Sequence, residues 1–274
     1  KALEIVHNDL IYPRENLGED NISFNENIKI SDLFFEYKEE TPILNNVNLE
    51  IKKGSKIAFI GESGSGKSTL VDIIIGLYKP SIKGDILVDG VKLTDKNIKD
   101  WRKNIGYIPQ SVYLFDGTVE ENIVFYRKYN KEKVIEALKK ANIYDFLALK
   151  EGIDTMVGEG GVMLSGGQKQ RVALAREFYA DPSLLIFDEA TSALDYESEK
   201  AIQDNMAYIC RDRTVIIIAH RLSAVRSADR IIAMENGQVI EDGSHEELMN
   251  NSQGRYRRLV KMQQMVSGDS EVTS

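Results

Sequence analysis

The sequence predicts an α/β fold with a parallel sheet at its core, an antiparallel β layer near its start and a mostly helical insertion at about 116–180. Two patterns support this prediction. Short, wholly apolar runs at 57–60, 184–187 and 215–218 are typical of parallel strands that helices cover on both faces. Residues 46–51 instead alternate between polar and apolar side chains, which is the period-two pattern of a half-buried antiparallel strand.

The other elements follow from local patterns along the chain. A hairpin is predicted at 86–93, because Asp89-Gly90 stands as a two-residue turn between two apolar stretches. A strand is expected at 105–108. Helices are predicted for the segments that separate the apolar runs, namely 70–77, 131–140, 168–179 and 196–210.

Both ends of the chain depart from these patterns. Residues 1–25 contain Pro13, Gly18 and several acidic residues without periodicity, which indicates a linker or an extended arm. Residues 266–274 are polar and expected to be disordered, so the folded domain is expected at 26–265. The sequence has no initiator Met, no secretory apolar segment and no run of the ~18–20 apolar residues that span a bilayer. These features are expected of a piece of a longer polypeptide.

Composition disfavours a nucleic-acid partner and excludes a cysteine-based site. The formal net charge is −8, whereas a nucleic-acid scaffold needs a surplus of Lys and Arg to meet phosphates, so no nucleic-acid partner is expected. Cys210 is the only cysteine, so no internal disulfide and no cysteine-rich metal site can form. The histidines, His7, His220 and His245, are too scattered to suggest a metal cluster.

Polar groups follow the apolar strands at the point where each strand ends. A glycine-rich loop begins at Gly61, Asp188-Glu189 follows the run at 184–187, and His220 and Gln110 follow two further strands. Ligands of open α/β sheets bind at the carboxyl ends of strands. The sequence therefore predicts that these groups converge on one site.

Residues 61–68, GESGSGKS, match the phosphate-binding pattern G-x-x-x-x-G-K-[ST]. The glycines let backbone N–H groups turn inward toward phosphate oxygens, and the following helix directs its positive end at the anion. Lys67 adds a charge toward the β and γ phosphates, and Ser68 offers its hydroxyl to Mg²⁺. The loop predicts a nucleoside triphosphate with Mg²⁺.

Asp188 and Glu189 indicate what happens to the bound triphosphate. A carboxylate at a strand end near such a loop holds magnesium, here through water. The adjacent Glu189 can orient and deprotonate the attacking water. Paired acids are often a solvated surface pair, but a position directly after four apolar residues disfavours that interpretation.

A second glycine-rich segment, LSGGQ at 164–168, precedes a predicted helix and forms another anion-binding helix N-terminus. One ATP does not obviously need two such cradles. The economical explanation is that this cradle serves the ATP of a partner copy, so a homodimer is expected.

Together these segments resemble the ABC ATPase family over about residues 28–250. The resemblance implies a P-loop NTPase (RecA-like) parallel-sheet core with an antiparallel β subdomain and a helical subdomain, and ATP and Mg²⁺ as cofactors. Six motifs in the family's order carry it: 61–68, Gln110, LSGGQ at 164–168 followed by Lys169-Gln170-Arg171, LLIFDE at 184–189, SALD at 192–195, and His220.

The resemblance also implies a role for each matching residue. Tyr37 would stack on adenine, although it could instead be a core strand aromatic. Gln110 would contact Mg²⁺ and the attacking water, and His220 the γ-phosphate. Asp195 would cross the dimer interface. The expected catalytic residues are Glu189, His220, Gln110 and Lys67; the metal ligands Ser68, Gln110 and Asp188; and the nucleotide-binding residues Tyr37, Gly61, Ser63, Gly64, Ser65, Gly66, Lys67, Ser68, Thr69, Ser165, Gly166, Gly167, Gln168 and Asp195.

In this family each ATP lies between the phosphate loop of one copy and the LSGGQ of the other, and closure and opening drive transmembrane domains of the same polypeptide. Residues 1–25 would then link the domain to such a membrane domain, at the cytoplasmic face of the inner (plasma) membrane. The loop at 155–161 looks like the exporter loop that contacts intracellular helices, and Glu159 favours an exporter over an importer.

Three alternatives stay open. DNA-associated ABC ATPases carry a long coiled coil between phosphate loop and signature, whereas Lys67 and Ser165 are 98 positions apart without sustained heptads. Translation-associated ABC proteins carry two sets of motifs, and one occurs here. A regulatory module that does not hydrolyse ATP is opposed by Glu189 and His220.

The transported substrate is the least determined feature. Segments such as ENLGE at 15–19 and IGYIPQSVYLFDGT at 105–118 look most like flippases of lipid-linked oligosaccharides, which we take as the main expectation. Segments such as IFDEATSALDYESE at 186–199 look as much like exporters of toxins and peptides, which is the alternative.

Overall fold

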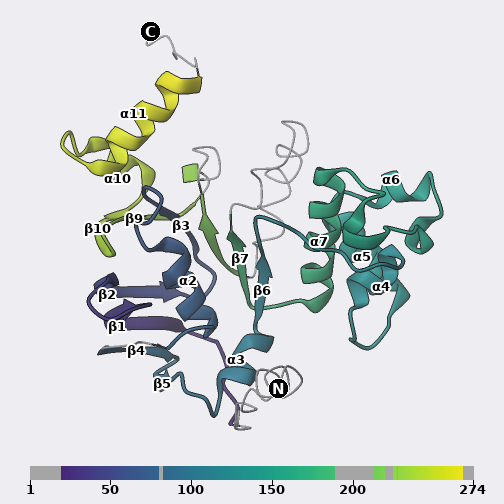
Figure 1. Ribbon diagram of the computed structural model, residues 1–274, viewed down its shortest axis with the longest axis horizontal. Coiled ribbons are helices and arrows are strands. Elements are labelled where there is room, and N and C mark those ends of the chain that lie inside the picture. The colour runs from purple at the N-terminus through teal and green to yellow at the C-terminus, as the bar shows by residue number, and fades with distance from the viewer. Residues whose placement is uncertain (1–19, 80–82, 189–212, 220–224, 227, 268–274) are drawn as a thin grey trace, which may run out of the picture.

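The structure is a computed structural model that describes residues 20–79, 83–188, 213–219, 225, 226 and 228–267. Two sheets and their helices form one lobe, and a group of helices forms a second lobe beyond strand β6 (Figure 1). None of the helices in the described part is long and apolar enough to cross a bilayer.

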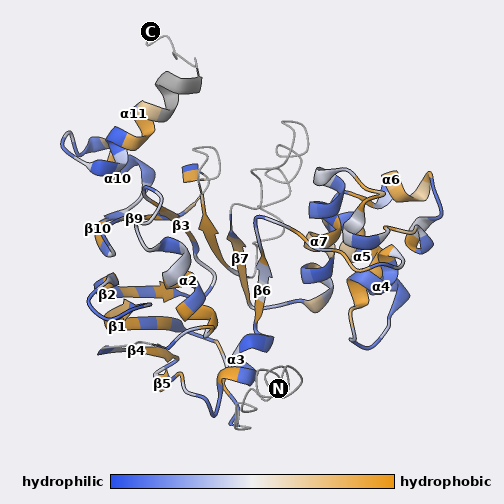
Figure 2. Cartoon of the chain, viewed as in Figure 1, coloured by the Kyte–Doolittle hydropathy of each residue, from blue (hydrophilic) through white to orange (hydrophobic). Residues whose placement is uncertain are grey.

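The larger sheet has six strands in the order β10-β9-β3-β8-β7-β6. All neighbours are parallel except β10, which runs antiparallel to β9. The predicted apolar strands at 57–60, 184–187 and 215–218 are confirmed, and Figure 2 shows them as hydrophobic. The bounds are β3 Lys56–Ile60, β6 Ile105–Ile108, β7 Leu184–Asp188, β8 Thr214–Ile218, β9 Arg230–Glu235 and β10 Gln238–Gly243.

The smaller sheet is antiparallel, with the order β2-β1-β4-β5. The alternation at 46–51 buries Val47, Leu49 and Ile51, as predicted. The predicted hairpin is confirmed, since Asp89 and Gly90 have φ values of 49° and 77° and so form the left-handed turn that matches strand twist. The bounds are β1 Asn27–Glu36, β2 Pro42–Lys52, β4 Lys83–Val88 and β5 Val91–Lys92.

The second lobe is built on α7, which packs against α4 and α5. Each of these helices begins at a side-chain cap, with Thr118 capping α4, Asn130 capping α5 and Ser165 capping α7. The bounds are α4 Val119–Val124, α5 Lys131–Lys140, α6 Tyr144–Ala148, the 3₁₀ turns Gly152–Asp154 and Glu159–Gly161, and α7 Gly166–Ala180.

The six-stranded sheet has a hydrophobic core on each face, because successive strand side chains point to opposite sides. One core joins the sheet to the helical lobe. The other joins it to the antiparallel sheet and to α2 (Lys67–Ile75) and α3 (Ile98–Lys103). Helix α2 was expected to reach residue 77, but it ends before Gly76, whose φ of 81° terminates it.

The described structure extends beyond the predicted domain bounds of 26–265 at both ends. Ile22 and Phe24, within the expected linker, are buried. The ring of Phe24 meets that of Trp101 edge to face at 5.8 Å, and Ile22 N–H donates to Asp100. Part of the segment expected as a linker therefore packs against the folded domain. At the other end α10 spans His245–Asn250 and α11 Arg255–Ser267, while the helix predicted at 196–210 lies outside the described residues.

Candidate functional site

The loop between β3 and α2 has a backbone that only glycine tolerates. Gly61, Gly64 and Gly66 have φ values of 151°, 81° and 100°. A Cβ atom on Gly61 would lie 2.3 Å from the Met234 carbonyl oxygen and 2.7 Å from Ser65 Oγ. The backbone at Gly61 is therefore closed against a side chain, and the left-handed conformation of the three glycines suits a cradle for phosphate oxygens.

Lys67 places its ammonium inside this loop. Its Nζ donates to the carbonyl oxygens of Gly61 and Glu62 at 2.9 Å and bonds Ser65 Oγ at 3.2 Å, and the side chain is buried. A buried cation in a loop that leads into a helix N-terminus fits a polyphosphate anion. The loop residues thus fit the triphosphate that the sequence predicts.

Tyr37 lies beside the same helix. Its hydroxyl is 3.1 Å from Thr69 Oγ1, and its ring meets Tyr78 edge to face at 5.3 Å. The side chain is 53% exposed, so Tyr37 is not a core aromatic. An exposed ring that is joined to α2 at this point is placed to receive a nucleobase.

Oxygen-bearing side chains gather beyond the loop. Ser68 is exposed on the first turn of α2, Asp188 ends β7, and Gln110 follows β6, the neighbouring strand. Hydroxyl, carboxylate and amide oxygens are the ligands that Mg²⁺ accepts, together with water and phosphate. This donor set fits the expected metal.

Asp188 has two polar neighbours that the sequence did not single out. Tyr107 donates its hydroxyl to Asp188 Oδ2 at 2.8 Å. Burial and the charge of Asp188 raise the pKa of Asp72 above its usual value. Burial, followed by the hydrogen bond to Asp188, raises the pKa of Tyr107. The alternation of side chains along 105–108 was the only signal that could have placed Tyr107 on this face.

The LSGGQ segment forms the N-terminus of α7. Ser165 Oγ accepts from the Gln168 N–H at 3.3 Å, and Gln168 Oε1 accepts from the Ser165 N–H at 2.9 Å, which is a capping box. Ser165 and Gly166 are exposed. This N-terminus belongs to the helical lobe, whereas the phosphate loop and α2 belong to the other lobe (Figure 1).

The structure thus brings some predicted residues together and leaves others apart. Residues 61–69, Tyr37, Gln110 and Asp188 lie around one end of the parallel strands, while residues 165–168 do not join them within one chain. Glu189, Asp195 and His220 lie outside the described residues.

One further neighbour of the loop comes from far along the sequence. Arg255, at the start of α11, donates to Glu62 Oε1 and also pairs with Glu235 at 3.2 Å. The Gly237 N–H donates to the Ser65 carbonyl at 3.1 Å. The loop is thus held from the side of β9 and β10, which no local sequence pattern indicated.

Comparison with known proteins gives consistent matches. A family model described as "ABC transporter" matches residues 44–192. The chain is 50% identical over 242 residues to the leukotoxin translocation ATP-binding protein LktB of Mannheimia glucosida, covering 86% of this chain and 34% of that protein. The same protein from Bibersteinia trehalosi matches equally. The chain therefore spans about a third of the length of these curated relatives.

A solved structure is similar over most of the fold. A bacterial Atm1-family ABC exporter with ATP bound superposes with a TM-score of 0.84 at 37% sequence identity. The match covers 90% of this chain and 43% of that one.

Proposed function

The chain belongs to the ABC transporter family, and from this premise we propose that it is the ATP-binding and ATP-hydrolysing motor domain of an ABC exporter. The observation that carries the proposal is the loop at 61–68, where a left-handed glycine backbone surrounds a buried lysine ammonium. That combination supports phosphate binding.

Residues of one copy bind the nucleotide first. Backbone N–H groups of the loop and Lys67 hold the phosphates, and Tyr37 stacks on the base. Ser68, Gln110 and Asp188 would hold Mg²⁺, which when bound neutralises charge on the β and γ phosphates. Glu189 accepts a proton from the attacking water, in the role of a general base.

The second copy completes the site. Ser165 and Gly166, at the start of α7, are exposed, on a different lobe from the loop. We propose that they meet the triphosphate held by a partner copy, so that closure requires the intact γ-phosphate. Hydrolysis then removes the contact and lets the two copies separate.

A steady-state phosphate-release assay tests this function. The purified chain is expected to hydrolyse ATP only with Mg²⁺, and its specific activity is expected to rise with protein concentration, because two copies build each site. Nucleotide binding without phosphate release would instead identify a regulatory module.

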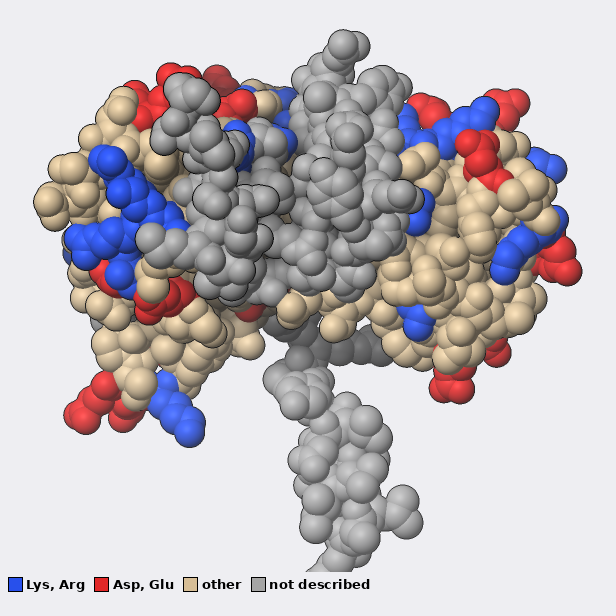
Figure 3. All heavy atoms as spheres, turned by 90° about the horizontal axis from the view of Figure 1, so that it is seen from above, with Lys and Arg blue, Asp and Glu red and all other residues tan. Residues whose placement is uncertain are grey.

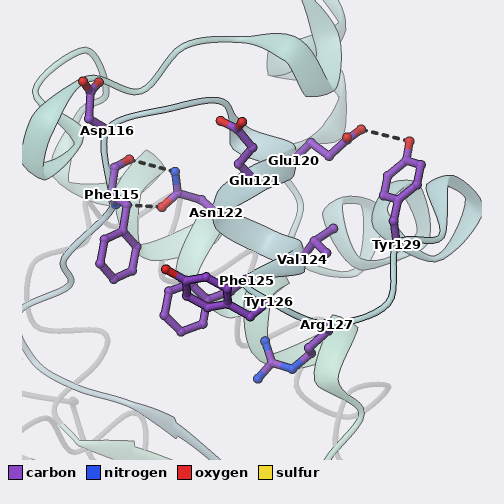
Figure 4. Close-up of a pocket in the computed structure, with 10 residues that line it drawn as sticks. All are labelled: Phe115, Asp116, Glu120, Glu121, Asn122, Val124, Phe125, Tyr126, Arg127 and Tyr129. Carbon is purple, nitrogen blue, oxygen red and sulfur yellow. Dashed lines mark hydrogen bonds between the residues drawn. The ribbon is translucent and has the colours of Figure 1, made fainter.

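An exposed aromatic pocket on the helical lobe is the proposed docking place for the transmembrane domains. Its volume is about 530 Å³, and its walls include Phe115, Phe125 and Tyr126 (Figure 4). Phe115 and Phe125 stack at 4.9 Å, and Arg176 lies over both rings. Tyr126 is 98% exposed.

Two further features support this docking. Phe125 and Tyr126 have φ values of 37° and 63°, which bulky residues rarely adopt and which keep the Tyr126 ring on the surface. The segment that lines the pocket also pairs with the loop at 155–161, because Thr118, between the lining residues Asp116 and Glu120, forms a bridge with Met156. Exposed aromatic clusters of this kind typically contact another protein segment.

Replacing Tyr126 by Ala tests the docking. In the full-length transporter we expect substrate-stimulated ATP hydrolysis and transport to fall roughly tenfold or more, as expected for an interface anchor. ATP hydrolysis by the separate domain should stay within about twofold, because the pocket lies away from the phosphate loop. Leu149→Ala, at another exposed apolar position of the same lobe, is the matched control. Equal effects of the two substitutions would contradict the docking.

For the substrate, the relatives support the alternative expectation. Their names describe translocation of a leukotoxin, and nothing among them favours a lipid-linked oligosaccharide. We therefore propose a polypeptide substrate, recognised by membrane helices outside this chain. Reconstituted full-length transporter should hydrolyse ATP faster with an unfolded polypeptide than with a lipid-linked oligosaccharide.

In Figure 3 acidic and basic side chains lie on both lobes of the visible face. This mixture differs from the single basic surface that nucleic-acid backbones attract. We propose that the domain works at the cytoplasmic face of the membrane, as a pair of copies below two transmembrane domains.

A further inference from the structure

Tyr107 and Asp188 lie on adjacent parallel strands. In the register of β6 and β7, Tyr107 pairs with Ile186, two residues before Asp188. Because strand side chains alternate, Tyr107, Ile186 and Asp188 share one face of the sheet. That face packs against α2, which carries Ser68. The tyrosine therefore approaches Asp188 from the side of the phosphate-binding helix.

The contact between them is specific. The Tyr107 hydroxyl is 2.8 Å from Asp188 Oδ2, within normal hydrogen-bond distance, and it acts as the donor. A bond from a hydroxyl to a carboxylate is stronger than one between neutral groups. It restricts rotation of the carboxyl group and occupies one oxygen, so that Oδ1 is the oxygen left for another ligand.

We propose that Tyr107 is a positioning residue for the metal site: its hydroxyl holds Asp188 Oδ2 and so presents Oδ1 to the Mg²⁺, or to a water on it, that Ser68 also ligates. The inference rests on the proposed function, because it assigns Asp188 to the metal. It adds a residue that contacts neither nucleotide nor metal and that acts through the orientation of a ligand.

Packing alone is the competing explanation. Tyr107 also contacts the hydrophobic core on this face of the sheet. Phenylalanine would keep that packing and remove only the hydroxyl. Tyr107→Phe therefore separates the two explanations, since a merely structural tyrosine would leave metal binding unchanged.

The experiment measures metal binding directly, using Mn²⁺ as a probe. Free Mn²⁺ is titrated by electron paramagnetic resonance in the presence of excess protein and ATP. Outer-shell hydrogen bonds change metal affinity by roughly 10–100-fold, and for Tyr107→Phe we expect a loss of about tenfold. ATP binding in EDTA should stay at the parental value, because Tyr107 does not reach the nucleotide.

The matched control is Tyr179→Phe. Tyr179 is buried, and its hydroxyl donates to the Lys128 carbonyl in the helical lobe. This variant loses a part-buried tyrosine hydrogen bond, as Tyr107→Phe does, but far from Asp188. Its Mn²⁺ affinity should equal that of the parent. In steady-state assays Tyr107→Phe should need about ten times more Mg²⁺ for half-maximal hydrolysis and approach parental turnover at saturation.

Parental Mn²⁺ affinity in a folded Tyr107→Phe variant would overturn the proposal, and so would an equal loss in Tyr179→Phe. Failure of the proposed function looks different. In that case a mixture of the parental chain and ATP would bind no more Mn²⁺ than the same ATP without protein, whatever residue stands at 107.

Discussion

Replacing Glu189 by Gln is expected to lower ATP turnover by roughly 10²–10⁴, the usual contribution of a general base, while ATP binding is retained. Glutamine has nearly the same size and still accepts hydrogen bonds, but its amide cannot take a proton from water. Steady-state phosphate release gives the turnover, and titration with a fluorescent ATP analogue gives the affinity.

The matched control for this variant is Glu132→Gln. Glu132 is exposed in the first turn of α5, in the helical lobe, and its replacement should leave turnover unchanged. Hydrolysis at the parental rate by Glu189→Gln would show that the catalytic base has been assigned to the wrong residue.

Gly61→Ala is expected to reduce ATP affinity by roughly 10–100-fold. The new methyl group would lie 2.3 Å from the Met234 carbonyl oxygen, which belongs to β9. That strand is buried and paired with β3 directly before the loop, so the loop must move instead. Backbone strain of about 1–3 kcal/mol at a φ of 151° adds to the steric effect.

Gly64→Ala separates steric exclusion from backbone strain. Gly64 has a φ of 81°, but a Cβ atom there meets nothing within 4 Å. We expect a smaller loss of ATP affinity than for Gly61→Ala, and a smaller decrease in Tm. An equal or larger effect at Gly64 would mean that the contact with Met234 does not determine the shape of the loop.

The sequence predicted the sheets well because their patterns are local. A strand that is covered on both faces must be apolar at every position, so residues 57–60 and 184–187 were recognisable without any tertiary information. The hairpin turn at Asp89-Gly90 was recognisable for a related reason, because few residue pairs accept its left-handed backbone.

Other features depend on contacts that no local pattern shows. Ile22 and Phe24 are only two apolar residues in a polar segment, and their burial is decided by Trp101, which lies much further along the chain. Tyr107 is likewise an ordinary strand residue until the pairing of β6 with β7 brings Asp188 within 2.8 Å.

The candidate site likewise has parts that the sequence could predict and parts that it could not. The phosphate loop and the capped start of α7 each have a short motif that could be identified alone. Their relation in space could not, because within one chain they belong to different lobes. The substrate could not be predicted from these residues, because we propose that membrane helices outside them select it. The main expectation of a glycan gives way to a polypeptide proposed from the relatives.

The most direct test is the molar mass of Glu189→Gln in solution, measured by light scattering at high protein concentration. With MgATP, the variant should have twice the 30.9 kDa of one chain, and with ADP it should return to a single chain. A variant saturated with MgATP that keeps the mass of one chain at every concentration would contradict the shared site.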